Sequence, residues 1–124
     1  MQEAINKAHT LIEALEYIQR FKGRIVVVKV GGSVMDDEKA MDDLLTDVVF
    51  MSTVGMHPVV VHGGGKAISR AMEAARLEVQ FVQGQRYTDQ RTLAIVEHVL
   101  IRQINDGVCR ALKEMGAGAM GLHS

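Results

Sequence analysis

Two runs of β-branched residues, each followed at once by glycines, constrain this chain more than any other feature of its sequence. The first run is Ile25–Val30, which ends at Gly31-Gly32, and the second covers 58–62 and ends at Gly63-Gly64-Gly65. Neither run alternates with polar residues as a strand with one solvated face does. This pattern predicts two strands buried on both faces of a parallel sheet.

Helical patterns alternate with these runs along the chain. Apolar residues recur every three or four positions, which predicts helices over 2–20, 38–54, 66–76 and 89–114. A hairpin is expected over 79–88 and a further strand over 117–123. The stripe expected to face the core from the last helix is Leu93, Val96, Leu100, Ile104, Val108 and Leu112. The order is typical of an α/β fold, a mostly parallel sheet flanked by helices.

The first predicted helix is amphipathic, and a charged stretch at 20–24 separates it from the rest of the chain. We therefore divide the chain into an N-terminal amphipathic helix, 1–22, and an α/β unit, 23–124. The apolar face of this helix can pack on its own core or on another subunit. The sequence leaves both arrangements open.

Charge, cysteine content and hydropathy exclude several classes of protein. Fourteen Lys and Arg against fifteen Asp and Glu leave a net charge of −1, so the chain has no basic surplus for binding nucleic acid. One cysteine, Cys109, can form no disulfide within the chain, and we expect a reducing, cytoplasmic location. No run approaches the ~20 apolar residues that cross a bilayer. The five histidines show no metal-binding spacing, so we expect no metal site.

The two glycine loops are the strongest candidates for a binding site. Each follows a predicted strand and precedes a helix, whose N-terminus presents free N–H groups to an anion. Glycine also lets the backbone approach a ligand closely. Neither loop has the spacing of a Walker A loop or of the dinucleotide-binding fingerprint. Two such loops on neighbouring strands predict facing walls of one site for an anionic ligand.

Two cationic residues stand near these loops. Lys29 interrupts an apolar run two residues before Gly31, where a charged side chain is costly unless it is paired or at an open end. A lysine there can offer a point charge to phosphate, or it can face solvent on an edge strand. Arg86, in the expected hairpin, can bind a carboxylate or phosphate through two parallel N–H bonds, or lie solvated on the surface.

Three motifs, in this order, resemble the amino acid kinase family, and in particular the N-terminal half of its acetylglutamate kinases. They are Lys-Val-Gly-Gly at 29–32, Pro-Val-Val-Val-His-Gly-Gly-Gly at 58–65 and Gly-Gln-Arg-Tyr-Thr-Asp at 84–89. Residues 116–122 are similar to the strand that leads into the family's next glycine loop. The helix that ends at 17–21 is similar to the N-terminal extension of the arginine-inhibited, hexameric members.

The resemblance implies a role for each candidate residue. Lys29 would be the catalytic residue that stabilises the transferring phosphoryl group, and Gly31 and Gly32 would bind the phosphates of ATP. The residues that would hold N-acetyl-L-glutamate are Gly64, Gly65 and, at its α-carboxylate, Arg86. The implied reaction belongs to arginine biosynthesis: ATP with Mg²⁺ phosphorylates the γ-carboxylate to an acyl phosphate.

Further expectations follow from the same resemblance. The family's second lysine, its organising aspartate and its adenine pocket lie in a C-terminal, ATP-binding half. We expect that half to be absent here, and the 124-residue chain alone to show little kinase activity. The resemblance also implies a homo-oligomer, a dimer or a hexamer through the N-terminal helix, and L-arginine as feedback inhibitor. Lys66-Ala67 stand where the family often has Pro-Gln.

Two other functions compete with this interpretation. Kinases for aminoadipate derivatives in lysine biosynthesis share both loops and the Arg-Tyr-Thr-Asp motif, although the N-terminal helix favours acetylglutamate. The kinase-like domains of acetylglutamate synthases sense arginine without transferring phosphate. Those domains typically lose the lysine at the position of Lys29 and alter the second loop, and both features are intact here.

Overall fold

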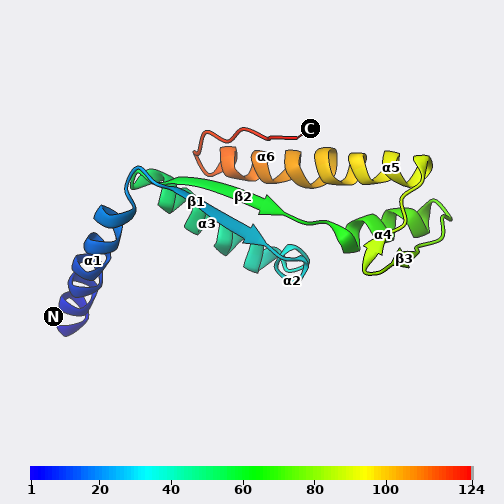
Figure 1. Ribbon diagram of the computed structural model, residues 1–124. Coiled ribbons are helices and arrows are strands. Elements are labelled where there is room, and N and C mark those ends of the chain that lie inside the picture. The colour runs from blue at the N-terminus through cyan, green and yellow to red at the C-terminus, as the bar shows by residue number, and fades with distance from the viewer. Residues whose placement is uncertain (124) are drawn as a thin grey trace.

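A computed structural model describes residues 1–123 as two short parallel strands with helices packed against one face, together with a small hairpin (Figure 1). The amphipathic helix α1 projects from one end of the molecule, and the opposite end holds α4 and a small hairpin. The elements in chain order are α1 (Gln2–Phe21), β1 (Ile25–Val30), α2 (Gly32–Met35), α3 (Glu38–Thr53), β2 (His57–His62), α4 (Gly65–Ala74), β3 (Phe81–Val82), β4 (Gln85–Arg86), α5 (Gln90–Glu97), η1 (His98–Asn105) and α6 (Asp106–Glu114).

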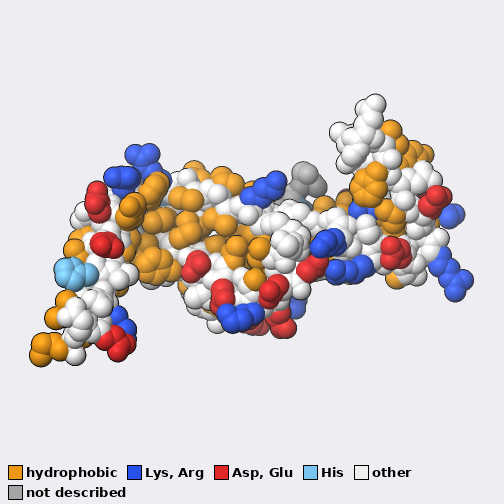
Figure 2. All heavy atoms as spheres, turned by 90° about the horizontal axis from the view of Figure 1, so that it is seen from below, with side chains coloured by type: hydrophobic (Ala, Val, Ile, Leu, Met, Phe, Trp, Pro, Cys, Tyr) orange, Lys and Arg blue, Asp and Glu red, His pale blue; other side chains and the backbone are white. Residues whose placement is uncertain are grey.

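Strands β1 and β2 pair in parallel, from Ile25 opposite His57 to Val30 opposite His62. One face of this sheet packs on α3 and α6 through a core of Leu45, Val48 and Leu112. The prediction that both faces are buried is wrong. The other face is uncovered, with Ile25 72% and Val27 65% exposed, because no element among residues 1–123 packs over it. In Figure 2, hydrophobic side chains gather along this part of the molecule.

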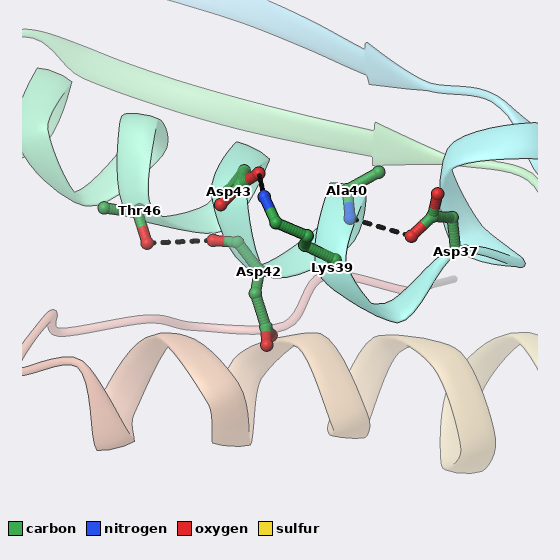
Figure 3. Close-up of polar contacts among 6 residues, drawn as sticks. All are labelled: Asp37, Lys39, Ala40, Asp42, Asp43 and Thr46. Atoms are coloured by element: carbon green, nitrogen blue, oxygen red, sulfur yellow. Dashed lines mark hydrogen bonds and ion pairs between the residues drawn. The ribbon is translucent and has the colours of Figure 1, made fainter.

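Helix α3 begins at Glu38, where the apolar periodicity predicts it. The carboxylate of Asp37 accepts a hydrogen bond from the Ala40 backbone N–H at 3.0 Å, and an ion pair joins Lys39 to Asp43 at 2.8 Å (Figure 3). An N-cap of this kind satisfies one of the N–H groups that the first helical turn leaves unpaired. Helix α3 is therefore regular from its first turn, and its apolar side packs against the sheet.

The hairpin predicted over 79–88 is present as β3 and β4. These two-residue strands are antiparallel, with Phe81 opposite Arg86. The two residues of the connecting turn, Gln83 and Gly84, both have positive φ, 51° and 78°. This is the combination that a type I′ turn requires, and its twist matches that of the strands it joins. The turn therefore fixes the position of Arg86 in the second strand.

The long helix predicted over 89–114 is continuous, but its centre, η1, is π-helical. The predicted stripe advances by four residues per step from Val96 onward. Each such step overshoots the 3.6-residue turn of an α-helix, and the wider π turn offsets this drift. All of the stripe is buried or half-buried except Leu93, which is 51% exposed, so its placement in the core is wrong. Val99, outside the stripe, is instead fully buried beside Ile68 and Met72.

Helix α1 extends over Gln2–Phe21, as the periodicity predicts, but it contains no buried residue. Its apolar side chains stay accessible, with Leu11 72%, Ile12 66% and Leu15 50% exposed. The helix therefore does not cover the core of its own chain. Neither it nor any other helix in residues 1–123 is long and apolar enough to span a membrane.

The strand predicted over 117–123 does not form. This segment runs back along α6 without joining the sheet (Figure 1). The Asn105 side-chain amide donates to the Leu122 carbonyl at 3.4 Å, and Ala117 and Ala119 pack against the Leu45 core. These contacts hold residues 117–123 against the helices, away from β2, so the two segments do not pair.

Candidate functional site

The two glycine loops leave the sheet side by side. Val30 and His62 are opposite each other at the ends of the parallel strands, so Gly31 and Gly63 follow at the same level. The loops line one cleft of about 140 Å³, whose walls include Gly32, Gly64 and Gly65. Ligand sites of open α/β sheets lie at this carboxyl end of the strands. The two loops therefore line one cleft, as expected, and its use as a site for an anionic ligand stays a prediction.

Each loop leads directly into a helix. Gly31 is the N-cap of α2, a short helix that the sequence pattern does not predict, and Gly64 is the N-cap of α4. A Cβ atom on Gly64 would lie 2.6 Å from Leu100 Cδ2 and 2.9 Å from Ile104 Cδ1. The absence of a side chain at Gly64 is thus what lets the π-helical segment approach the second loop.

Lys29 lies on the uncovered face of the sheet, the face that also carries Ile25 and Val27. Its side chain is exposed, and in residues 1–123 it takes part in none of the ion pairs. This is the open-end placement that makes a lysine tolerable in an apolar strand. Its ammonium group remains available to an anion near the first glycine loop.

Arg86 reaches from the hairpin to the second glycine loop. Its guanidinium donates to the Gly65 carbonyl at 2.9 Å, to the Ser69 hydroxyl at 3.0 Å and to the Met72 sulfur at 3.3 Å. It also lies over the ring of Phe81, 4.9 Å from the ring centre. These contacts hold Arg86 half-buried against α4. The sequence alone leaves open whether Arg86 is a binding residue or a solvated one.

Asp36 joins the two sides of the cleft. Its carboxylate contacts Lys66 Nζ at 3.2 Å and Arg70 NH2 at 3.0 Å. Arg70 first, and Lys66 second, lower the pKa of Asp36 below its ordinary value by donating hydrogen bonds to the ionised carboxylate. The segment after the first glycine loop is thereby tied to α4, which follows the second loop.

Sequence reasoning missed Asp36, Lys66, Arg70 and Ser69 as residues of the site. The only signals were indirect: Asp36 stands in an acidic run that reads as helix capping, and Lys66 departs from the usual residue of the resembled family. An ion pair between residues 34 positions apart is created by the meeting of two loops, which no local pattern specifies.

His62 contacts the second glycine loop. The imidazole of His62 hydrogen-bonds the Gly63 carbonyl at 3.0 Å, so it holds the loop as a polar structural residue. Among residues 1–123, no cluster of three His, Cys, Asp or Glu side chains could hold a metal ion.

A second, larger hollow lies between β2, the long helix and the C-terminal segment. Its volume is about 740 Å³, and its lining is mostly apolar. It separates β2 from residues 117–123, the two segments that the sequence predicts as strands of one sheet. None of the loop glycines at 31–32 and 63–65 lines it, whereas three of them line the smaller cleft, so we locate the candidate site there.

Comparison with known proteins identifies relatives for almost the whole chain. Residues 24–124 match the model of the amino acid kinase family. An acetylglutamate kinase of Methanocaldococcus jannaschii is 49% identical over 98% of this chain and 41% of its own length. An acetylglutamate kinase of Halothermothrix orenii is 43% identical over 98% of this chain and 42% of its own length. The chain thus spans about two fifths of the length of these relatives.

Solved structures share the fold. The protein smu.665 of Streptococcus mutans UA159 superimposes with a TM-score of 0.70 and 28% identity, over 80% of this chain and 40% of its own. An N-acetylglutamate synthase from Neisseria gonorrhoeae, complexed with coenzyme A and N-acetyl-glutamate, gives a TM-score of 0.66 at 21% identity, over 86% of this chain and 24% of its own. At that identity the second likeness concerns the fold alone.

Proposed function

The chain belongs to the amino acid kinase family, and we propose that it is the N-terminal part of an acetylglutamate kinase. The whole enzyme would transfer the γ-phosphoryl group of ATP to the γ-carboxylate of N-acetyl-L-glutamate, as a step of arginine biosynthesis. One observation carries the proposal: two glycine loops flank one cleft at the ends of adjacent parallel strands, with Arg86 bound to the second loop. The identity to acetylglutamate kinases supports it.

The proposed reaction makes modest demands on protein groups. A carboxylate oxygen of acetylglutamate attacks the γ-phosphorus of ATP, a new P–O bond forms, and the bond to the β-phosphate oxygen breaks to release ADP. The nucleophile carries no proton, so no general base is needed. Phosphoryl transfer of this kind depends on positioning and on the neutralisation of charge. Backbone N–H groups and cations, which this cleft offers, are suited to both tasks.

On the nucleotide side, we assign Gly31 and Gly32 to the phosphates and Lys29 to the transferring group. Gly31 and Gly32 are exposed, and no atom lies within 4 Å of a Cβ position at Gly31, so a phosphate can approach the backbone. Lys29, two residues earlier, can place a point charge on the phosphoryl oxygens as negative charge shifts during transfer.

For acetylglutamate, we assign Gly64 and Gly65 to the backbone contacts and Arg86 to the α-carboxylate. Both N–H groups of Arg86 Nη2 bind Gly65 and Ser69, and one of Nη1 binds Met72, which leaves the Nε–H and one Nη1–H as single, non-parallel donors for a ligand. A guanidinium held in this way is pre-organised for a carboxylate, because little side-chain freedom is lost when the ligand binds. The hairpin thus sets where the substrate's α-carboxylate would lie.

ATP and Mg²⁺ enter this proposal as substrate and companion ion. The carboxylate at the cleft, Asp36, is already paired with two cations, so the described residues do not supply a Mg²⁺ site. Mg²⁺ in phosphoryl-transfer sites is held largely by the phosphates and by water. We also propose the cytoplasmic location, assembly through α1 and feedback by L-arginine that the resemblance implies. The uncovered apolar face of α1 supports the assembly proposal.

A chimaera tests the proposed function. Residues 1–124 would replace the matching part of the acetylglutamate kinase of Methanocaldococcus jannaschii, and ADP release would be measured with N-acetyl-L-glutamate and MgATP. We expect turnover that depends on acetylglutamate, and at least a tenfold loss, about 1.4 kcal/mol of barrier, on Lys29→Ala. Lys39→Ala, on the exposed surface of α3, is the matched control.

Two results would overturn parts of this proposal. A folded chimaera without acetylglutamate-dependent turnover would leave the chain with a binding or sensing role. A preference for N-acetyl-aminoadipate over acetylglutamate in direct competition would replace the substrate and place the chain with the kinases of lysine biosynthesis.

A further inference from the structure

The ion pairs of Asp36 differ from the others in residues 1–123. The remaining four ion pairs each join side chains four residues apart on one helix. Those of Asp36 instead join two separate elements, the segment after β1 and helix α4. They lie at the cleft between the two glycine loops, which makes them part of its geometry.

Each carboxylate oxygen of Asp36 serves one cation. Oδ2 contacts Lys66 Nζ at 3.2 Å, and Oδ1 accepts a hydrogen bond from Arg70 NH2 at 3.0 Å. The Asp36 side chain is 32% exposed, whereas those of Lys66 and Arg70 are 64% and 65% exposed. The Asp36 carboxylate thus lies between two cations whose side chains remain exposed to solvent.

All three side chains line the cleft together with Gly32, Gly64 and Gly65. The Cδ atom of Lys66 lies 4.0 Å from the Cβ position of Gly32, so the lysine stem extends across to the first loop. Two cations and one carboxylate leave a surplus of one positive charge at the cleft. The N-terminus of α4, which begins at Gly65, adds the positive end of its helix dipole.

We propose that Lys66 and Arg70 form an anion subsite of this cleft, which takes phosphate oxygens, and that Asp36 occupies the subsite when no phosphate is bound. The lysine supplies a point charge, and the arginine supplies N–H donors in a planar fork. A phosphate that arrives displaces the carboxylate by ligand exchange, and no covalent bond changes. The choice of phosphate as ligand rests on the proposed function, whereas the subsite itself rests on the contacts above.

Calorimetric titration of the 124-residue chain with inorganic pyrophosphate tests the subsite at low ionic strength. Asp36→Asn removes the competing carboxylate and should bind pyrophosphate about fivefold more tightly, a factor equal to the upper range for an exposed ion pair. Lys66→Met and Arg70→Met should each bind about fivefold more weakly. The exposed Lys39–Asp43 pair on α3 provides matched controls with the same charge changes, Asp43→Asn and Lys39→Met.

The controls separate a subsite from a general effect of net charge. Asp36→Asn binding no more tightly than Asp43→Asn, or Lys66→Met binding as well as Lys39→Met, would overturn the proposal. Circular dichroism reports whether each variant is folded, and the lysine and arginine variants decide the matter if Asp36→Asn is not. Pyrophosphate contains no part of acetylglutamate, so a chain that binds acetylglutamate but shows no subsite would refute this inference and leave the proposed function standing.

Discussion

A side chain at Gly64 would collide with the helix beneath the second glycine loop, since its Cβ would lie under 3 Å from atoms of Leu100 and Ile104. Both side chains would have to shift in a packed region. We therefore expect Gly64→Ala to lower the free energy of unfolding by about 1–3 kcal/mol, the usual cost of overpacking. Urea denaturation followed by circular dichroism measures this loss.

Gly63 provides the control at the neighbouring position. No atom lies within 4 Å of its Cβ position, so Gly63→Ala should change the free energy of unfolding by less than about 1 kcal/mol in either direction. An equal loss in the two variants would show that the close approach of η1 does not explain the glycine at position 64.

The residues of the candidate site differ in how well the sequence could predict them. Lys29, the glycines and Arg86 could be singled out as candidates because each stands next to a strand end or a turn, and local patterns mark those places. The partners of Arg86 were not predictable, because Ser69 and Met72 meet it only when the hairpin folds back on α4. The ion pairs of Asp36 depend on the meeting of two loops in the same way.

In the long helix, the burial predicted from the apolar periodicity differs most clearly from the burial that packing produces. Counting apolar positions predicts Leu93 in the core, yet Leu93 is 51% exposed and Val99 is fully buried. We expect Val99→Ala to lose about 2 kcal/mol of unfolding free energy, from the buried methyl groups and the cavity they leave. Leu93→Ala should lose less than about 0.5 kcal/mol.

Urea denaturation of the two variants compares these positions directly. A larger loss for Leu93→Ala than for Val99→Ala would restore the arrangement that the periodicity predicts and contradict the register of η1. The π-helical turn was not predicted, although the four-residue steps of the apolar stripe are compatible with it; η1 packs against α4 and the second loop.

The helix and strand boundaries elsewhere were largely predictable. Proline, glycine and capping residues mark the ends of α3 and β2, and the structure keeps those ends within about two residues. The failures concern contacts between elements. The strand expected over 117–123 instead lies along α6, held by Asn105 and by its alanines. The sheet face that carries Val27 stays uncovered, since burial on a second face requires another layer.

Helix α1 offers a prediction about assembly. Its apolar residues contact no core of the chain, so we expect them to pack against another subunit. The double change Leu11→Glu with Leu15→Glu should reduce the mass of the particle, measured by light scattering, to that of one chain. The control, Asn6→Glu with Gln19→Glu, adds the same charge at polar positions of the same helix. An unchanged mass in the leucine variant would contradict assembly through this face.

At the scale of the whole molecule, the chain combines a formed cleft with surfaces that it does not cover itself. The glycine loops, Arg86 and the Asp36 ion pairs are all positioned by contacts within residues 1–123. The uncovered sheet face carries Lys29, next to the first glycine loop, and α1 projects from the end of the molecule opposite α4. The chain covers about two fifths of its acetylglutamate kinase relatives. We therefore propose that residues 1–124 hold the acetylglutamate half of the proposed kinase site.

Calorimetric titration of N-acetyl-L-glutamate into the folded chain tests this claim most directly. We expect saturable binding that is lost on Arg86→Ala and kept on Arg91→Ala, an exposed arginine of α5 outside both glycine loops and the hairpin. Circular dichroism would confirm that all three proteins are folded. Binding that survives Arg86→Ala would contradict the role assigned to Arg86. The absence of any binding by the folded chain would contradict the claim that the acetylglutamate half-site is complete in these residues.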